Sequence, residues 1–543
     1  MEWNVNYERF GVMLDMSRNG VMKVEEVKKF IDCISKMGYN MLELYTEDTY
    51  EIEGEPCFGY MRGRYTAKEL KEIDSYALSR GVELIPCIQT LAHIHGILRY
   101  RMTYGSIIDV NDILLVDEPK TYALLDKMFA ALAKNFTSRL VNIGMDEAHM
   151  VGLGKFLDKH GYQNRFEILT RHLNKVVEIA KKYGFIPHMW SDMFFRLALN
   201  GSYYADKDFT FSPTIVNAVP QDVELVYWDY YRKPKEKFDI MFDAHKQFGR
   251  TVWFAGGAKT WEGFAPFNEQ SLITQKPAMQ SLRENGIKNV IITVWGDDGR
   301  ECSYFAVLPS LYAMRQYADG NFDEDSIKKG FYETFHIAYD DFMALDLPNV
   351  AGVKDANGRE KSQNPCKTLF YADPFMGKYD ALVEKSKPIP YKEHAKTLAE
   401  KAKSAGEFSY IFETLSALCS VLEIKSTLGV DTRRVYKSRD KNALKPIIEK
   451  YKTAEKRLEI FYNAFYNLWH KENKAFGWEV FDVRLGGLKQ RLKTCRMVLE
   501  AYANGEQGSI EELEEEVLLE SPEIHLYNSG FYAELVSYGR LSW

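Results

Sequence analysis

The stretch "RLVNIGMDEAHM" (residues 139–150) decides how the rest of the chain is interpreted. Its first part, from Leu140 to Ile143, is an apolar, β-rich run that is typical of a buried strand. The run reaches a glycine and then delivers two neighbouring acids, Asp146 and Glu147. Because like charges repel, two adjacent carboxylates at the end of a buried strand indicate a chemical role. The structural alternative is a helix N-cap followed by a first-turn acid.

The pattern of a short apolar run followed by a stretch of helical period repeats along about the first 320 residues. Strands are expected within residues 10–18, 40–48, 82–90, 139–147, 186–194, 223–231, 250–258 and 289–299. Several of the intervening helices are expected to end at a glycine, namely Gly38, Gly81, Gly184, Gly249 and Gly320. Eight such units predict an α/β fold, a (β/α)8 TIM barrel over residues 1–325. A doubly wound open sheet is the alternative.

The barrel hypothesis predicts where chemistry should lie, because catalytic residues of this fold sit at the carboxyl ends of the strands. Acidic, other polar and aromatic residues do follow the apolar strand bodies. They are Asp15, Arg18, Glu47, Asp48, Gln89, His93, Asp146, Glu147, Trp190, Asp192, Trp228, Asp229, Tyr230, Trp261, Trp295 and Asp297. A ring of carboxylates and tryptophans suits a sugar, since carboxylates bind hydroxyls and indole rings pack on the apolar faces of a pyranose.

The pattern changes beyond the barrel. Residues 326–390 are rich in turn formers and are expected to be an irregular linker or packing region. Residues 391–543 are rich in Ala, Glu, Lys and Leu with helical period, which predicts a mostly α-helical C-terminal domain. The total of 543 residues is too long for one ordinary core, in agreement with this division.

Composition narrows the classes of partner. The net charge of −7 gives no electrostatic reason to expect nucleic acid or a membrane surface as a partner. No apolar run approaches the roughly 20 residues of a membrane span. The N-terminus has no signal-peptide pattern, and the seven cysteines are scattered without a CxxC pair. We therefore expect a cytoplasmic protein with reduced thiols.

Five segments, taken in order, resemble strand-end motifs of glycoside hydrolase family 20, the β-N-acetylhexosaminidases. They are "FGVMLDMSRN", "KMGYNMLELYTED", "GVELIPCIQTLAH", "VNIGMDEAH" and "IITVWGDDG". The resemblance covers about residues 7 to 300. It implies an exo-acting enzyme that removes terminal β-linked GlcNAc or GalNAc by a retaining, substrate-assisted mechanism, in which the acetamido oxygen of the substrate is the nucleophile. It implies no metal and no other cofactor.

The resemblance also implies roles for individual residues. Glu147 would be the general acid and base, and Asp146 would hold the acetamide N–H. The implied substrate-binding residues are Arg9, Asp48, His93, Trp190, Trp228, Tyr230, Trp295 and Asp297. Arg9 departs from the family spacing by one residue, so Glu8 or Arg18 could contribute instead. Tyr230 is the substitute for a tyrosine that the seventh strand lacks, and Glu43 and Tyr45 stand where the family has two histidines.

Three other functions stay open at this point. A lacto-N-biosidase of the same family would need a wider pocket for a disaccharide. A non-catalytic sugar-binding barrel would not need the pair of acids. A metal-dependent barrel hydrolase is suggested only by His93 and His95, whose spacing resembles a pair of metal ligands. A small carbohydrate is thus the expected partner, and a homodimer through the helical domain is an expected assembly.

Overall fold

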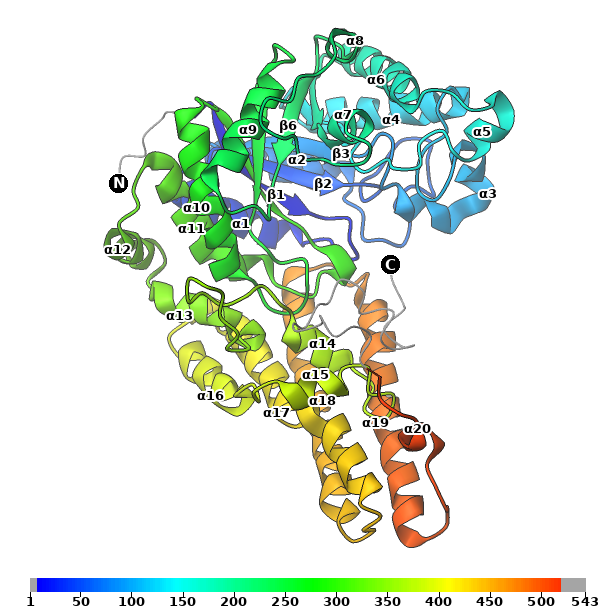
Figure 1. Cartoon of the computed structure of the whole chain (residues 1–543). Helices are drawn as coiled ribbons and strands as arrows, with labels where there is room; N and C mark the ends of the chain where they lie inside the picture. The colour runs from blue at the N-terminus through cyan, green and yellow to red at the C-terminus, as the bar shows by residue number, and fades with distance from the viewer. Residues whose placement is uncertain (1–6, 519–543) are drawn as a thin grey trace. The chain divides into compact units, whose positions relative to one another are not determined.

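Eight parallel strands close into a barrel in the order of the sequence (Figure 1). The structure, a computed structural model, describes residues 7–518. The strands are β1 (Arg9–Asp15), β2 (Met41–Thr46), β3 (Glu83–Ile88), β4 (Leu140–Asn142), β5 (Ile186–Trp190), β6 (Glu224–Trp228), β7 (Val252–Gly257) and β8 (Asn289–Val294). All eight lie where the sequence predicts them, and β8 pairs with β1, so the barrel is confirmed and the open sheet is excluded.

Helices follow the strands and cover the barrel. They are α1 (Val24–Lys36), α2 (Ala67–Ser79), α3 (Arg101–Tyr104), α4 (Pro119–Asn135), α5 (Lys155–His160), α6 (Arg165–Lys182), α7 (Asp192–Ala198), α8 (Pro213–Ala218), α9 (Lys235–Lys246), α10 (Asn268–Glu284) and α11 (Leu308–Asp319). After β5 only the short α7 and α8 are present.

Local sequence explains the ends of these helices. Thr66 and Glu69 form a reciprocal capping box at the start of α2, which satisfies backbone N–H groups that have no partner within the helix. The five glycines predicted to follow helices all have positive φ angles. At Gly81, for example, φ is 71°, a conformation that costs glycine little and lets the chain turn directly into β3.

The chain divides into two compact units, and the division does not follow a single cut. The first unit comprises residues 1–258, 271–295 and 310–327, and the second comprises residues 259–270, 296–309 and 328–543. The prediction of a boundary near residue 325 therefore omits two loops, which follow β7 and β8 and are grouped with the second unit. The two units are described separately below.

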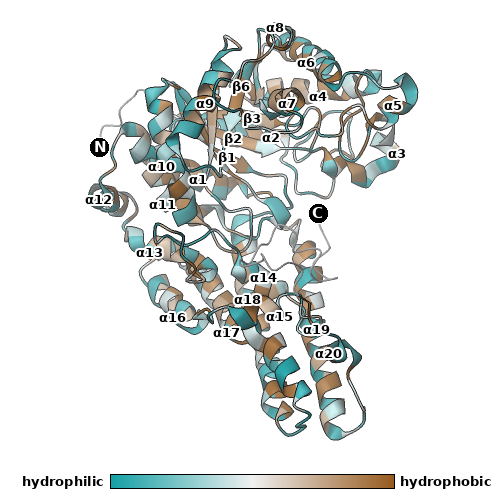
Figure 2. Ribbon diagram, in the orientation of Figure 1, coloured by the Kyte–Doolittle hydropathy of each residue, from teal (hydrophilic) through white to brown (hydrophobic). Residues whose placement is uncertain are grey.

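Up to residue 518 the second unit is largely helical, as predicted for residues 391–543, and residues 519–543 of that prediction lie outside the described residues. Its helices include α13 (Tyr339–Met343), α14 (Pro365–Tyr371), α15 (Asp380–Lys385), α16 (Tyr391–Ala402), α17 (Ser409–Lys437), α18 (Leu444–Glu472), α19 (Trp478–Asn504) and α20 (Glu511–Glu514). α17 packs against α16 and α18, and α18 packs against α19. Apolar and hydrophilic residues are mixed along α18 and α19, as expected of helices that bury one side (Figure 2).

The prediction for residues 326–390 needs correction. This region holds the end of α12 (Glu324–Phe335), together with α13, α14 and α15, so it is not simply an irregular linker. Turn residues are frequent here because they separate short helices. None of the helices within residues 7–518 is long and apolar enough to cross a membrane.

Candidate active site

The two adjacent acids lie on a tight turn after β4, within the first unit. Gly144, Met145 and Glu147 have φ angles of 70°, 71° and 50°. Only glycine adopts this conformation without strain, and other residues pay about 1–3 kcal/mol for such sparsely populated backbone. At Gly144 a side chain is also sterically excluded, because a Cβ atom would lie 2.1 Å from Oε1 of Gln89. The turn therefore must be stabilised by its surroundings.

Side chains from β4 and from just after β3 accept two N–H groups of this turn. Oδ1 of Asn142, at the end of β4, accepts the N–H of Gly144 at 3.1 Å. Oε1 of Gln89, just after β3, accepts the N–H of Met145 at 3.2 Å. These bonds join the turn to β3 and β4. The alternative in which the acids cap a helix is excluded, because the next helix, α5, begins only at Lys155 and has Gly154 at its N-cap.

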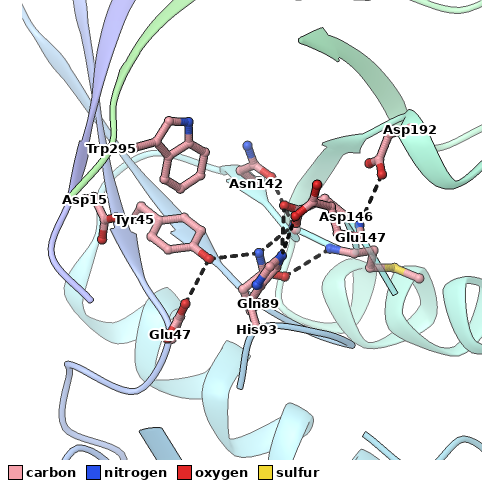
Figure 3. A network of polar contacts seen from close by, with 12 residues as sticks. Asp15, Tyr45, Glu47, Gln89, His93, Asn142, Asp146, Glu147, Asp192 and Trp295 are labelled. Atoms are coloured by element: carbon pink, nitrogen blue, oxygen red, sulfur yellow. Dashed lines mark hydrogen bonds and ion pairs between the residues drawn. The ribbon is translucent and has the colours of Figure 1, made fainter. Parts of the chain in front are cut away.

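Asp146 and Glu147 point into different environments (Figure 3). The carboxylate of Asp146 accepts a hydrogen bond from Nε2 of Gln89 at 2.8 Å and lies 3.4 Å from Nε2 of His93. Its side chain is 12% exposed, whereas that of Glu147 is 42% exposed. Within residues 7–518 no hydrogen bond reaches the carboxyl of Glu147, and His93 lies 3.7 Å from its Oε2 atom. Asp146 is thus held in place by its partners, and Glu147 is accessible.

The charge of Asp146 is stabilised by its partners. Burial disfavours the carboxylate, but His93 and the hydrogen bond from Gln89 outweigh burial and hold the pKa of Asp146 below its usual range. Burial likewise disfavours the imidazolium of His93, but Asp146 outweighs it and raises the pKa of His93 to about 9. The pair is therefore an anion and a cation at neutral pH.

A chain of hydrogen bonds continues from Asp146 across the barrel mouth (Figure 3). Nε2 of Gln89 also donates to the hydroxyl of Tyr45 at 3.0 Å, and this hydroxyl donates to Glu47 at 3.1 Å. Nε of Arg18 lies 3.4 Å from Glu47, and its Nη1 lies 3.2 Å from Asp15. Burial raises the pKa of Glu47 to about 7, although Arg18 opposes this shift.

Aromatic side chains line the same end of the barrel. Nε1 of Trp295 donates to the hydroxyl of Tyr230 at 3.1 Å, and the ring of Tyr230 stacks on that of Trp228 at 5.3 Å. The rings of Trp190 and Trp295 lie 6.1 Å apart. Four of the predicted sugar-binding residues thus form one connected group. The buried Nε1 of Trp190 has no hydrogen-bond partner among residues 7–518.

Asp48 is near this region but already engaged. Its carboxylate lies 2.9 Å from Nη2 of Arg62, which also donates to the carbonyl of Ser17 at 2.7 Å. The side chain of Asp48 is only 1% exposed. This burial favours a supporting role over direct contact with a sugar.

The prediction for Arg9 is wrong. Arg9 is the first residue of β1 and pairs in register with Asn289, the first residue of β8, so it lies at the amino end of the barrel. Its Nε atom contacts Glu83, the first residue of β3, at 3.0 Å. The physical reason is strand length, because the seven residues of β1 separate Arg9 from the carboxyl end. Arg18, the alternative that the sequence offered, lies at the mouth.

Asp297 begins the short 3-10 turn η3 (Asp297–Gly299), which follows Trp295 in the chain but is grouped with the second unit. Its role in sugar binding stays a prediction. His93, which suggested a metal site, instead pairs with Asp146. The part of the chain that the structure describes holds no group of three or more His, Cys, Asp or Glu side chains placed to bind a metal ion.

Two residues that the sequence analysis did not assign also contact Glu147. Oδ2 of Asp192 accepts the backbone N–H of Glu147 at 3.1 Å, and Nη2 of Arg196 lies 3.7 Å from Oε1 of Glu147. Asp192 appeared among the residues at strand ends but without a role. Arg196 could have been found from its spacing of four residues after Asp192, which places both on one face of α7.

These features define the class: a closed parallel (β/α)8 barrel with carboxylates and aromatic rings at the carboxyl ends of its strands. Two family models match the chain. The one described as "Glycosyl hydrolase family 20, catalytic domain" matches residues 7–233, and "Glycoside Hydrolase 20C C-terminal domain" matches residues 340–528. The chain therefore belongs to glycoside hydrolase family 20, as the strand-end motifs predicted.

Individual relatives are distant. The chain is 24% identical over 329 residues to hexosaminidase D of Homo sapiens, a match that covers 56% of this chain and 64% of the relative. It is 25% identical over 170 residues to a beta-hexosaminidase of Akkermansia muciniphila, covering 25% of this chain and 34% of the relative. The chain thus spans less than two thirds of the length of these relatives.

Among solved structures, a GH20 exo beta-N-acetylglucosaminidase from Vibrio harveyi in complex with N-acetylglucosamine is 16% identical, with a TM-score of 0.48. The match covers 63% of this chain and 58% of that chain. This likeness is too loose to add to the strand order established above.

Proposed function

We propose that this protein is an exo-acting β-N-acetylhexosaminidase that hydrolyses terminal β-linked GlcNAc or GalNAc by a retaining, substrate-assisted mechanism. Membership of glycoside hydrolase family 20 supports hydrolysis of a glycosidic bond. One observation supports the mechanism most directly. Asp146 is held as an anion by Gln89 and His93, whereas the adjacent Glu147 is accessible. Two neighbouring acids with such different surroundings suit two different tasks.

In the first step Glu147 donates its proton to the glycosidic oxygen as the bond from that oxygen to the anomeric carbon breaks. The acetamido oxygen of the substrate forms the new bond to that carbon, which gives a cyclic oxazolinium ion. Asp146 accepts the acetamide N–H and stabilises the positive charge that develops on the ring. Because this nucleophile is part of the substrate, favourable orientation can supply about 7–11 kcal/mol of the barrier.

In the second step Glu147, now a carboxylate, removes a proton from water, and the water oxygen attacks the anomeric carbon. The bond to the acetamido oxygen breaks, and the acetamide is restored. Two displacements at one carbon give overall retention. Tyr230, Trp228, Trp190 and Trp295 are proposed to enclose the sugar ring and its acetamido group, in agreement with their grouping at the barrel mouth.

The test is turnover of 4-nitrophenyl β-glycosides of GlcNAc and GalNAc, together with a series in which fluorine replaces hydrogens of the N-acetyl methyl group. We expect kcat/KM to fall steeply as fluorine withdraws electrons from the acetamido oxygen. Turnover that is insensitive to fluorination would mean that the protein supplies the nucleophile, and the mechanism would be wrong. Absence of turnover with both sugars would contradict the proposed exo-hexosaminidase activity.

Two further expectations become part of this proposal. A cytoplasmic location is supported by the seven cysteines, all of which are free thiols, since disulfides are rare in reducing compartments. Fractionation of the cells that produce the protein would test it. A homodimer through the helical domain is proposed as the assembly, and sedimentation analysis of the whole chain would measure it.

A further inference from the structure

Asp192 and Arg196, on one face of α7, contact Glu147 from the side of β5. Asp192 accepts the backbone N–H of Glu147, and Nε of Arg196 donates to the same Oδ2 atom of Asp192 at 3.1 Å. We propose that Asp192 and Arg196 are positioning residues that hold Glu147 in the geometry of a proton donor. This inference rests on the proposed function, because it gives Glu147 the role of general acid.

The backbone of Glu147 needs such support. Its φ angle of 50° lies in the left-handed region, which is unfavourable for a residue with a side chain. Asp192 has no solvent exposure, so it is fixed by packing before it accepts the N–H of Glu147. Losing this acceptor would leave a partly buried N–H group without a partner, at a cost of about 1–3 kcal/mol. The easiest relaxation is rotation of the turn, which would move the carboxyl of Glu147.

Arg196 is itself held from several directions. Its Nη1 lies 3.4 Å from the carbonyl of Gly201, and its guanidinium lies 5.6 Å from the centre of the Tyr203 ring. The hydroxyl of Tyr203 accepts the backbone N–H of Trp228 at 3.0 Å, and the two rings pack 4.7 Å apart. The same segment therefore connects the expected proton donor with the aromatic residues expected to hold the sugar.

The distances around Arg196 suit both charge states of Glu147, the protonated acid and the carboxylate. Arg196 lies closer to Asp192, at 3.1 Å, than to Glu147, at 3.7 Å. Arg196 thus keeps its contact with Asp192 while Glu147 is protonated, and a small movement would bring it to the carboxylate that remains on Glu147 after proton transfer. His93 is a further charged neighbour of Glu147, with its Nε2 atom 3.7 Å from Oε2 of Glu147, and it also pairs with Asp146.

The experiment compares leaving groups. Proton donation matters most for a poor leaving group and least for an activated one such as 2,4-dinitrophenolate. We expect Arg196→Met to lower kcat/KM by about 10- to 100-fold for 4-methylphenyl β-glycosides of GlcNAc, the cost of a misplaced group. The loss should be less than about threefold for the dinitrophenyl glycoside, because little proton transfer is needed there. Arg196→Lys should recover part of the activity.

Asp192→Asn provides a second variant, since the amide keeps an acceptor for the Glu147 N–H but loses the charge that pairs with Arg196. It should show the same dependence on the leaving group, with a smaller loss. Lys182→Met is the matched control, because Lys182 is exposed at the end of α6, where it pairs with Asp126 and lies 5.0 Å from the centre of the Tyr183 ring. Its activity should equal that of the wild type.

Equal losses for both leaving groups, or no loss in either variant, would overturn the positioning role while leaving the proposed function intact. An inactive wild type would instead overturn the proposed function. The two failures are therefore distinguishable within one set of measurements.

Discussion

The barrel mouth and the second compact unit each contain a cluster of charged side chains, and the two clusters differ in how completely their charges are paired. In the second unit, Nζ of Lys367 lies 2.7 Å and Nη1 of Arg484 lies 3.2 Å from Glu301. The side chains of these three residues are 0%, 0% and 1% exposed. At the mouth, by contrast, Glu147 is 42% exposed and its cationic neighbours are 3.7 Å away.

This difference separates structural from reactive charge. Burying a charge costs several kcal/mol unless partners compensate it, so a cluster that only stabilises the fold pairs every group closely. A proton donor has to reach its substrate and change its charge during the reaction. Its neighbours are therefore paired mainly with other groups, as His93 is with Asp146 and Arg196 is with Asp192. The predictions below test this contrast, from the largest expected effect to the smallest.

The largest effect is expected at Glu147. Glu147→Gln removes the proposed proton donor and should lower kcat/KM by about 10²- to 10⁴-fold with a poor leaving group. Folding should be little affected, since the side chain is exposed. Steady-state kinetics and thermal unfolding of the same preparation measure both. A loss of activity below about fivefold would exclude Glu147 as the general acid.

A large effect on stability is expected in the second unit. Arg484→Met leaves the buried Glu301 with one cation fewer and should destabilise this unit by about 3–5 kcal/mol. Hydrogen exchange of peptides from α19 measures the local free energy of opening, without assuming that the two units unfold together. Lys489→Met, on the same helix, is the control, because Lys489 pairs with Glu459 at the surface and its loss should cost about 0–1 kcal/mol. Similar values for both variants would contradict the contrast drawn here.

The pH dependence of stability should report on His93. The pKa of His93 is raised from 6.5 to about 9 in the folded protein. Its stabilising contribution is therefore complete below pH 6.5 and is lost as the pH rises through about 9. We expect a decrease of about 1–3 kcal/mol over this interval. Burial raises the pKa values of Asp192 and Glu47 to about 7. These two groups therefore lower the stability at lower pH, as the pH rises from the usual carboxyl range to about 7.

Urea unfolding of the wild type and of His93→Gln between pH 6 and pH 10 would test this prediction. In the variant, the free energy of unfolding should no longer fall above pH 7.5. The change in stability below pH 7, which comes from Asp192 and Glu47, should remain. A wild-type curve that is flat above pH 7.5 would mean that the ion pair of His93 with Asp146 is not formed.

The smallest effect is expected at Arg9, which belongs to neither cluster. Its ion pair with Glu83 is about one third exposed, and Arg9→Ala should cost about 0–1 kcal/mol without changing kcat/KM. Arg18→Ala is the comparison, since Arg18 contacts Asp15 and Glu47 and lies 4.9 Å from the ring of Trp295. It should raise KM. A rise in KM for Arg9→Ala instead would return Arg9 to the sugar site.

The sequence by itself determined the barrel, the helical character of the second unit and the family. Its two signals, short apolar runs for the strands and a period of 3.6 residues for the helices, are local properties that can be read along the chain. The position of Asp146 and Glu147 directly after a strand was also readable, because a parallel barrel gathers the carboxyl ends of all its strands at one mouth.

Only the tertiary structure decided which of these side chains become partners and which of them stay accessible. Gln89 and Asp146 are far apart in the chain, as are Arg62 and Asp48, and no spacing in the sequence predicts which groups become partners. The packing of loops on neighbouring strands left Asp146 buried and Glu147 accessible, placed Arg18 rather than Arg9 at the mouth, and brought Asp192 and Arg196 to Glu147. Pairing and burial depend on all the elements that meet at a point, so the charge state and reach of each acid follow from the fold and not from the motif.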